Sequence, residues 1–186
     1  MKIIRFADLA AVPWKNGGGV TREIARLDID GAMCWRLSIA DVASEGPFSK
    51  FAGMQRILTV IEGASMQLER DDGGTLIADI LVPVRFTGDE AVNGLLPHGP
   101  CRDFNVIWNP FVVAATVQIA GSDTPPIFDA SGDVYCGLLC VSKSLELSGL
   151  ANLTFADFVA LDSSDAPISI VDGTALLVRI SAASKP

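Results

Sequence analysis

The stretch W-R-L-S-I-A-D-V at residues 35–42 decides the fold class, because its polar and apolar side chains alternate. In an extended strand its large apolar side chains fall on one face, whereas Arg36 and Ser38 fall on the other. The same period of two recurs outward in both directions, and a sustained helical period does not occur. Many short strands at this spacing predict an all-β protein built as a sandwich or a barrel.

A similar strand pattern occurs twice along the chain. L-T-V-I-E-G-A-S-M-Q-L at 58–68 is followed by the similar G-L-L-C-V-S-K-S-L-E-L at 137–147. Between them, residues 121–133 hold two prolines and two glycines among small polar residues, which is typical of a linker. We therefore expect two β-sandwich units in tandem, an N-terminal one at 1–120 and a shorter one at 134–186. A single distorted domain is the alternative.

Composition narrows the class of protein. The formal net charge of -8 lacks the basic footprint that nucleic-acid binding needs. No apolar run approaches the roughly 18 residues of a membrane span, and charges interrupt the start M-K-I-I-R-F-A-D-L, so we expect a cytoplasmic protein. Residues 1–56 hold 8 Lys/Arg and 6 Asp/Glu, whereas 57–186 hold 6 and 16. The excess of positive charge in residues 1–56 suits a small anion bound by the N-terminal half. Charge scattered over the surface without a binding role is the alternative.

Histidine and cysteine usage argues against a metal site. The chain has one histidine, His98, whereas zinc and non-haem iron sites usually need two or three. The four cysteines form no C-x-x-C pair, and we expect them to be buried free thiols. The nucleophile motif G-x-S-x-G is absent. We therefore expect no metal and no other cofactor.

Three consecutive glycines follow Trp14, Lys15 and Asn16 and precede V-T-R. A phosphate-binding Walker loop needs its lysine after the glycines, and a dinucleotide fingerprint needs a helix where this sequence alternates like a strand. Glycines of this kind form a plain turn, or they let the main chain pass close to a ligand. The residues alone leave both interpretations open.

Polar side chains on strand faces are the other candidates for a site. Arg36 and Ser38 share a face, and Arg56 begins the next strand. In an open sheet this face meets solvent, whereas in a small barrel it lines the interior, where two arginines together would bind a carboxylate. Asp103 and Asn105 share a face of a later strand, where Asp103 would accept from an arginine or from a ligand amine. A purely structural Arg–Asp pair is the alternative.

Five stretches in this order resemble the HutD/Ves family: P-W-K-N-G-G-G-V-T-R-E-I-A, W-R-L-S-I-A-D-V, G-P-F-S-K-F-A-G-M-Q-R, F-T-G-D and D-F-N-V-I-W. The resemblance is strong over residues 1 to about 120. It implies a bicupin, two cupin-like β-barrels in tandem, without the histidine set that holds a metal in many cupins. The family's shared polar set falls here on Trp14, Lys15, Asn16, Gly17, Gly18, Thr21, Arg22, Arg36, Ser38, Phe48, Ser49, Arg56, Asp103 and Asn105.

The resemblance also implies a role beside histidine utilisation, with an acidic intermediate such as formiminoglutamate as the ligand. We therefore expect a metal-free protein that binds a small anionic, nitrogen-containing metabolite in a regulatory or accessory role. Arg36 and Arg56 would hold a carboxylate, and Asp103 would pair with a cationic nitrogen or orient an arginine.

Two other classes stay open at this point. A metal-independent hydrolase or isomerase acting on such metabolites would need an acid or base, for which Asp103, Glu45, Lys15 and His98 are the candidates. A structural or interaction protein would use the cupin faces to form a homodimer.

Overall fold

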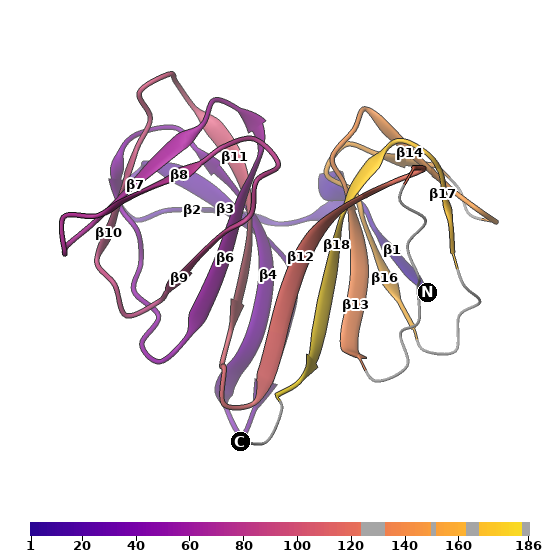
Figure 1. The fold of residues 1–186 in the computed structure, drawn as a ribbon, viewed down its shortest axis with the longest axis horizontal. Helices are drawn as coiled ribbons and strands as arrows, with labels where there is room; N and C mark the ends of the chain where they lie inside the picture. The colour runs from indigo at the N-terminus through magenta and orange to yellow at the C-terminus, as the bar shows by residue number, and fades with distance from the viewer. Residues whose placement is uncertain (124–132, 150–151, 163–167, 184–186) are drawn as a thin grey trace. The chain divides into compact units, whose positions relative to one another are not determined.

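The computed structural model describes residues 1–123, 133–149, 152–162 and 168–183. These residues form two compact units, one of Ala10–Val113 and one of Met1–Leu9 with Ala114–Pro186 (Figure 1). Strands dominate both units, and the one helical element in the described residues is a 3-10 turn, η1 at Phe6–Asp8. The all-β class expected from the alternation is confirmed.

The Ala10–Val113 unit consists of two antiparallel sheets. The larger has the order β2 (Ala11–Pro13), β3 (Gly19–Ile29), β4 (Ala32–Val42), β11 (Cys101–Trp108), β6 (Gln55–Gly63) and β9 (Val84–Thr87). The smaller has the order β5 (Gly46–Pro47), β10 (Val92–Leu95), β7 (Met66–Arg70) and β8 (Thr75–Ala78). Long central strands paired over eight positions, as in β4–β11, give this unit a rigid wall.

The interior of this unit is apolar at one end and polar at the other. The apolar end is a buried cluster to which both sheets contribute, including Val42, Val60, Met66 and Leu68. Because side chains alternate along a strand, Arg36, Ser38, Ala40 and Val42 on β4 share one face. One face of β4 therefore carries polar side chains at one end of the unit's interior and joins the apolar cluster at the other end.

The second unit has its own pair of sheets. One has the order β1 (Lys2–Ile4), β16 (Phe158–Leu161), β13 (Asp133–Cys140), β18 (Thr174–Ala182) and β12 (Val113–Gly121), and the other β15 (Leu153–Thr154), β14 (Ser144–Leu147) and β17 (Ile170–Asp172). Their buried aliphatic residues form a separate cluster around Leu138, Leu145 and Leu177.

The division between units differs from the one expected at residue 120. Residues 1–9 belong with the C-terminal unit because β1 pairs with β16 and because buried Asp157 holds the segment after β1 in place. Its carboxylate accepts hydrogen bonds from Phe6 N at 2.9 Å and from Arg5 Nη1 at 2.7 Å. Residues 114–120 also belong there, since β12 lies beside β18. Most of the expected linker 121–133 lies outside the described residues.

The four cysteines are free and buried, as expected. None of the helices in the described parts of the chain has the length and apolar character needed to cross a membrane.

Candidate functional site

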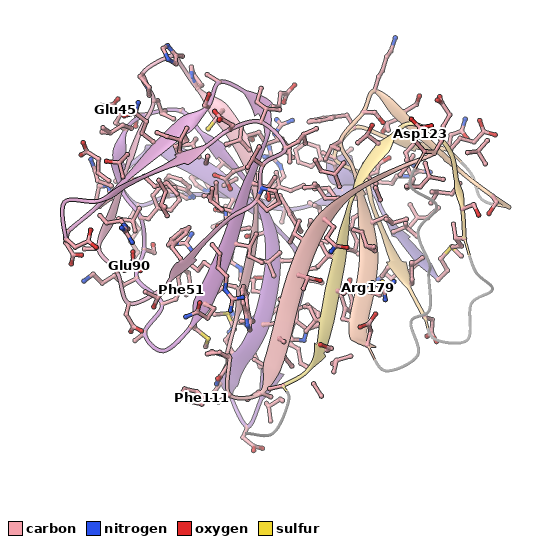
Figure 2. The ribbon with its side chains drawn as sticks, in the orientation of Figure 1. Glu45, Phe51, Glu90, Phe111, Asp123 and Arg179 are labelled. Atoms are coloured by element: carbon pink, nitrogen blue, oxygen red, sulfur yellow. The ribbon has the colours of Figure 1, made fainter. Side chains whose placement is uncertain are left out.

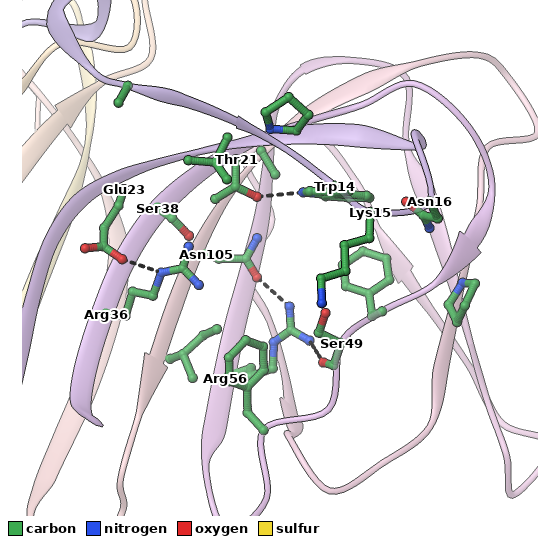
Figure 3. A pocket seen from close by; sticks show the side chains of 18 residues that line it. Trp14, Lys15, Asn16, Thr21, Glu23, Arg36, Ser38, Ser49, Arg56 and Asn105 are labelled. Atoms are coloured by element: carbon green, nitrogen blue, oxygen red, sulfur yellow. Dashed lines mark hydrogen bonds and ion pairs between the residues drawn. The ribbon is translucent and has the colours of Figure 1, made fainter. Parts of the chain in front are cut away.

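A cavity of about 800 Å³ opens into the polar end of the Ala10–Val113 unit (Figure 3). Ten of the fourteen residues predicted for a ligand site line it: Trp14, Lys15, Asn16, Thr21, Arg36, Ser38, Phe48, Ser49, Arg56 and Asn105. Gly17, Gly18, Arg22 and Asp103 are not among the lining residues. The structure therefore brings most of the predicted set together in one place.

Strand register explains the convergence. Asn105 on β11 lies opposite Ser38 on β4, and Ile107, two residues further on the same face, lies between Arg36 on β4 and Arg56 on β6. Side chains that share a face across three neighbouring strands necessarily point into the same space. The open-sheet alternative, in which Arg36 and Ser38 meet bulk solvent, is wrong, because this face lines the cavity.

Among the described residues that line the cavity, Arg56 is the one charged side chain that is buried, with only 5% of it exposed. Its guanidinium donates through Nη2 to Asn105 Oδ1 at 2.9 Å and through Nη1 to the Ser49 carbonyl oxygen at 3.3 Å. Its Cζ also lies over the rings of Phe48, Phe51 and Phe86, at 5.3, 5.4 and 4.9 Å from their centroids. Burial lowers the pKa of Arg56 to about 10, and the nearby charge of Asp103 opposes that effect.

Asp103 lies behind the cavity wall, fully buried. Asn105 Nδ2 donates to Asp103 Oδ1, so the amide of Asn105 joins this carboxyl to Arg56 (Figure 3 shows the Arg56–Asn105 link). Burial raises the pKa of Asp103 to about 7, although the Arg56 charge and the Asn105 hydrogen bond both act to lower it. The expected contact of Asp103 with a ligand is not supported, because Asn105 lines the cavity and Asp103 does not.

Glu23 is a lining residue that the sequence prediction missed. Its Oε2 lies 3.0 Å from Arg36 Nε, an ion pair whose angle is too bent for a regular hydrogen bond (Figure 3). The signal was available, because Glu23 follows Thr21 by two positions on β3 and so shares its face. Directly after it the β3–β4 register shifts, a bulge of the kind that re-aims side chains beside a site.

The glycine run supports the cavity mouth without lining it. Gly17 has a φ of +71°, and Trp14 N donates to Gly19 O at 2.9 Å, which closes a tight loop. A Cβ on Gly19 would lie 2.5 Å from the Asp41 carbonyl oxygen and 3.1 Å from the Trp14 ring. The close approach that these glycines permit is therefore to their own chain. The loop holds Trp14, whose Nε1 donates to Thr21 Oγ1 at 2.7 Å.

Arg22 lies on the opposite face of β3 from Thr21 and Glu23. Its Nη1 donates to Asp41 Oδ2 at 2.5 Å, and Arg102 Nε donates to the other Asp41 oxygen at 2.5 Å. Burial raises the pKa of Asp41, but these two arginines outweigh it and leave the pKa below its usual value. Arg22 thus points away from the cavity and pairs with Asp41, which gives no support to the predicted contact with a ligand.

Of the residues considered for acid–base catalysis, only Lys15 lines the cavity. Glu45 lies at the periphery of the unit (Figure 2), where its Oε1 accepts from Leu96 N at 3.0 Å. His98 is exposed in a loop. Within the described residues, His, Cys, Asp and Glu do not gather into a group of three that could hold a metal ion.

Comparison with known proteins gives consistent matches. The family model named HutD matches residues 6–178. A 21.2 kDa protein in the hutC 3′ region of Pseudomonas putida is 33% identical over 187 residues, which is 97% of this chain and 97% of that protein. Protein Ves of Escherichia fergusonii is 35% identical over 122 residues, covering 63% of this chain and 64% of Ves.

Among solved structures, HutD from Pseudomonas fluorescens SBW25, determined in a formate condition, superimposes with a TM-score of 0.87. It is 35% identical, and the match covers 98% of this chain and 99% of that one. The fold expected from the resemblance is confirmed as that of HutD, with two all-β units in one chain.

Proposed function

Because the chain belongs to the HutD family, we propose that its Ala10–Val113 unit binds a small anionic, nitrogen-containing metabolite, without a metal ion. The observation that carries this proposal is Arg56, a 95% buried cation at the wall of an 800 Å³ cavity. Among the described residues, no carboxylate hydrogen-bonds or ion-pairs with its guanidinium directly. The acid whose charge acts on it, Asp103, is linked to it by hydrogen bonds through Asn105.

A buried cation without a contacting anion is costly, because burial removes its hydration. A ligand carboxylate in the cavity would recover part of that cost through charge-assisted hydrogen bonds. Lys15 and Arg36 line the same cavity and add positive charge. The size of the cavity suits a small metabolite.

The metabolic setting comes from the relatives. One of them is located in a hutC 3′ region, and a solved relative is named HutD. We therefore propose a regulatory or accessory role in histidine degradation, with formiminoglutamate as the first ligand to test.

Isothermal titration with formiminoglutamate, L-glutamate and urocanate at pH 6.5 tests the proposal. We expect at least one to bind, and Arg56→Gln to weaken it by about tenfold or more, because a charged hydrogen-bonding partner is lost. Arg26→Gln is the matched control, since Arg26 forms an exposed ion pair with Asp28 outside the cavity. Absence of heat with all three compounds, or unchanged affinity in Arg56→Gln, would refute the proposal.

A metal-independent enzyme is the second candidate. One observation favours it: the pKa of Asp103, raised by burial to about 7, is in the range of a general acid or base at neutral pH. Against it, Asp103 lies behind Asn105 rather than at the cavity surface. Turnover of formiminoglutamate that Asp103→Asn abolishes, with ligand affinity retained, would favour the enzyme over the binding protein.

A further inference from the structure

We infer that Glu23 binds a cationic nitrogen of the ligand, so that the cavity selects dipolar, amino-acid-like metabolites. In this arrangement Arg56 and Lys15 hold a carboxylate, and Glu23 holds an ammonium or amidinium group. The inference rests on the proposed function, and it transfers to Glu23 the part that the sequence had assigned to Asp103.

The charges of the cavity wall are segregated. Among the described lining residues, Glu23 is the only acid, and the cations are Lys15, Arg36 and Arg56. Figure 3 shows Glu23 and Arg36 together at one side of the cavity, with Lys15 and Arg56 at the other side near Ser49. One side therefore carries net positive charge, whereas the other carries a balanced pair that includes an accessible carboxylate.

Glu23 has free capacity for a ligand. Its side chain is 44% exposed although it lines a cavity, its ion pair with Arg36 Nε is bent, and Arg26 interacts with it through charge without an ion pair within the described chain. A half-exposed pair of this kind contributes little to stability. A carboxylate can accept about four hydrogen bonds, so its capacity exceeds what Arg36 uses.

The span between the two sides fits one small molecule. Glu23 is on β3 and Arg56 on β6, three strand spacings apart in the sheet order β3-β4-β11-β6 and two residues apart along the strands, which is about 16 Å between backbones in a flat sheet. Both side chains extend into the interior and shorten that gap. A metabolite with a carboxylate and a cationic nitrogen a few bonds apart can therefore contact both.

Titration calorimetry with a matched pair of probes tests this inference. L-Glutamate and glutarate have the same carbon chain and carboxylates, and only L-glutamate carries an ammonium group. We expect the wild-type protein to bind L-glutamate about tenfold or more tightly than glutarate, as a charged hydrogen bond provides.

The variant Glu23→Gln should shift the two probes in opposite directions. L-Glutamate should weaken by about tenfold or more because its ammonium partner is lost. Glutarate should tighten by about threefold or more, because a repelling charge leaves the wall. Asp28→Asn, which removes an acid from the same strand outside the cavity, should change neither affinity.

The outcomes separate the inference from the proposed function. If Glu23→Gln weakens both probes by the same factor while its melting temperature matches that of the wild type, Glu23 only orients Arg36 and the inference fails while the proposed function stands. If wild type prefers glutarate, the inference fails likewise. If the wild type binds neither probe nor formiminoglutamate, the proposed function fails and the inference with it.

Discussion

Replacing Arg56 with methionine should destabilise the Ala10–Val113 unit by an amount that grows with pH. Asp103 is buried, and the positive charge of Arg56, together with the Asn105 hydrogen bond, keeps its pKa from rising beyond about 7. Methionine fills a similar volume without a charge, so the pKa of Asp103 in the variant must rise further. The penalty then depends on whether the carboxyl is forced to ionise.

The direction in which stability changes with pH follows from the coupling between protonation of Asp103 and folding. The folded-state pKa of Asp103 lies above its ordinary value of 3.8, so this group's contribution to stability is full below about pH 4 and is lost as the pH rises through the folded pKa. In the wild-type protein that loss ends near pH 7. In the variant the loss continues to higher pH, because the carboxyl stays protonated longer.

The magnitude has two parts. At pH 6, loss of the Asn105 hydrogen bond and of the contacts with three phenylalanine rings costs about 1–2 kcal/mol, whereas removal of the buried charge of Arg56 relieves its desolvation cost and offsets part of that loss. Above pH 7, the difference between variant and wild type should grow by about 1.4 kcal/mol per pH unit until the variant's Asp103 ionises. At pH 8.5 the difference between variant and wild type is then about 2 kcal/mol larger than at pH 6.

Urea unfolding followed by tryptophan fluorescence measures this difference, because Trp14, Trp35 and Trp108, the chain's three tryptophans, all belong to the Ala10–Val113 unit. Asp103→Asn in the Arg56→Met background is the control, and it should remove the pH dependence. The reasoning fails if the destabilisation is the same at pH 6 and pH 8.5, or if the double variant retains the slope.

Two further changes test the supporting structure. Gly19→Ala should lower the free energy of unfolding by about 1–3 kcal/mol, since its Cβ would lie 2.5 Å from the Asp41 carbonyl oxygen. Gly31→Ala, which faces open space at a φ of +79°, should cost only about 1 kcal/mol, and equal losses in melting temperature would contradict the packing argument. Asp157→Asn should cost about 1–3 kcal/mol at pH 7. Burial raises the pKa of Asp157, but hydrogen bonds from Arg5 and two backbone amides outweigh it and leave the pKa below its ordinary 3.8. The stabilisation is therefore present above about pH 4 and lost as the pH falls, so urea curves of variant and wild type should converge in acid and a constant gap would contradict this role.

Alternation along single strands predicted much of the site. A period of two placed Arg36 with Ser38, and Asp103 with Asn105, on shared faces before any pairing was known. The same parity applied to β3 would have separated Arg22 from Thr21 and brought Glu23 in. The family resemblance selected Arg22 by its motif, although the strand turns that side chain away from the cavity.

Alternation predicts which face of a strand a side chain lies on, but not how far along the strand it lies from the cavity of the Ala10–Val113 unit. Asp103 and Asn105 share a face, yet only Asn105 reaches the cavity. The reason is register: Asp103 lies between Val60 in the apolar cluster and Ala40, which belongs to that cluster and also borders the cavity, whereas Asn105 lies beside Ser38. Register depends on where three strands far apart in sequence meet, so a local pattern leaves it undetermined. A carboxyl placed two residues deeper thus becomes a buried partner that sets the charge of Arg56's surroundings instead of a group that meets the ligand.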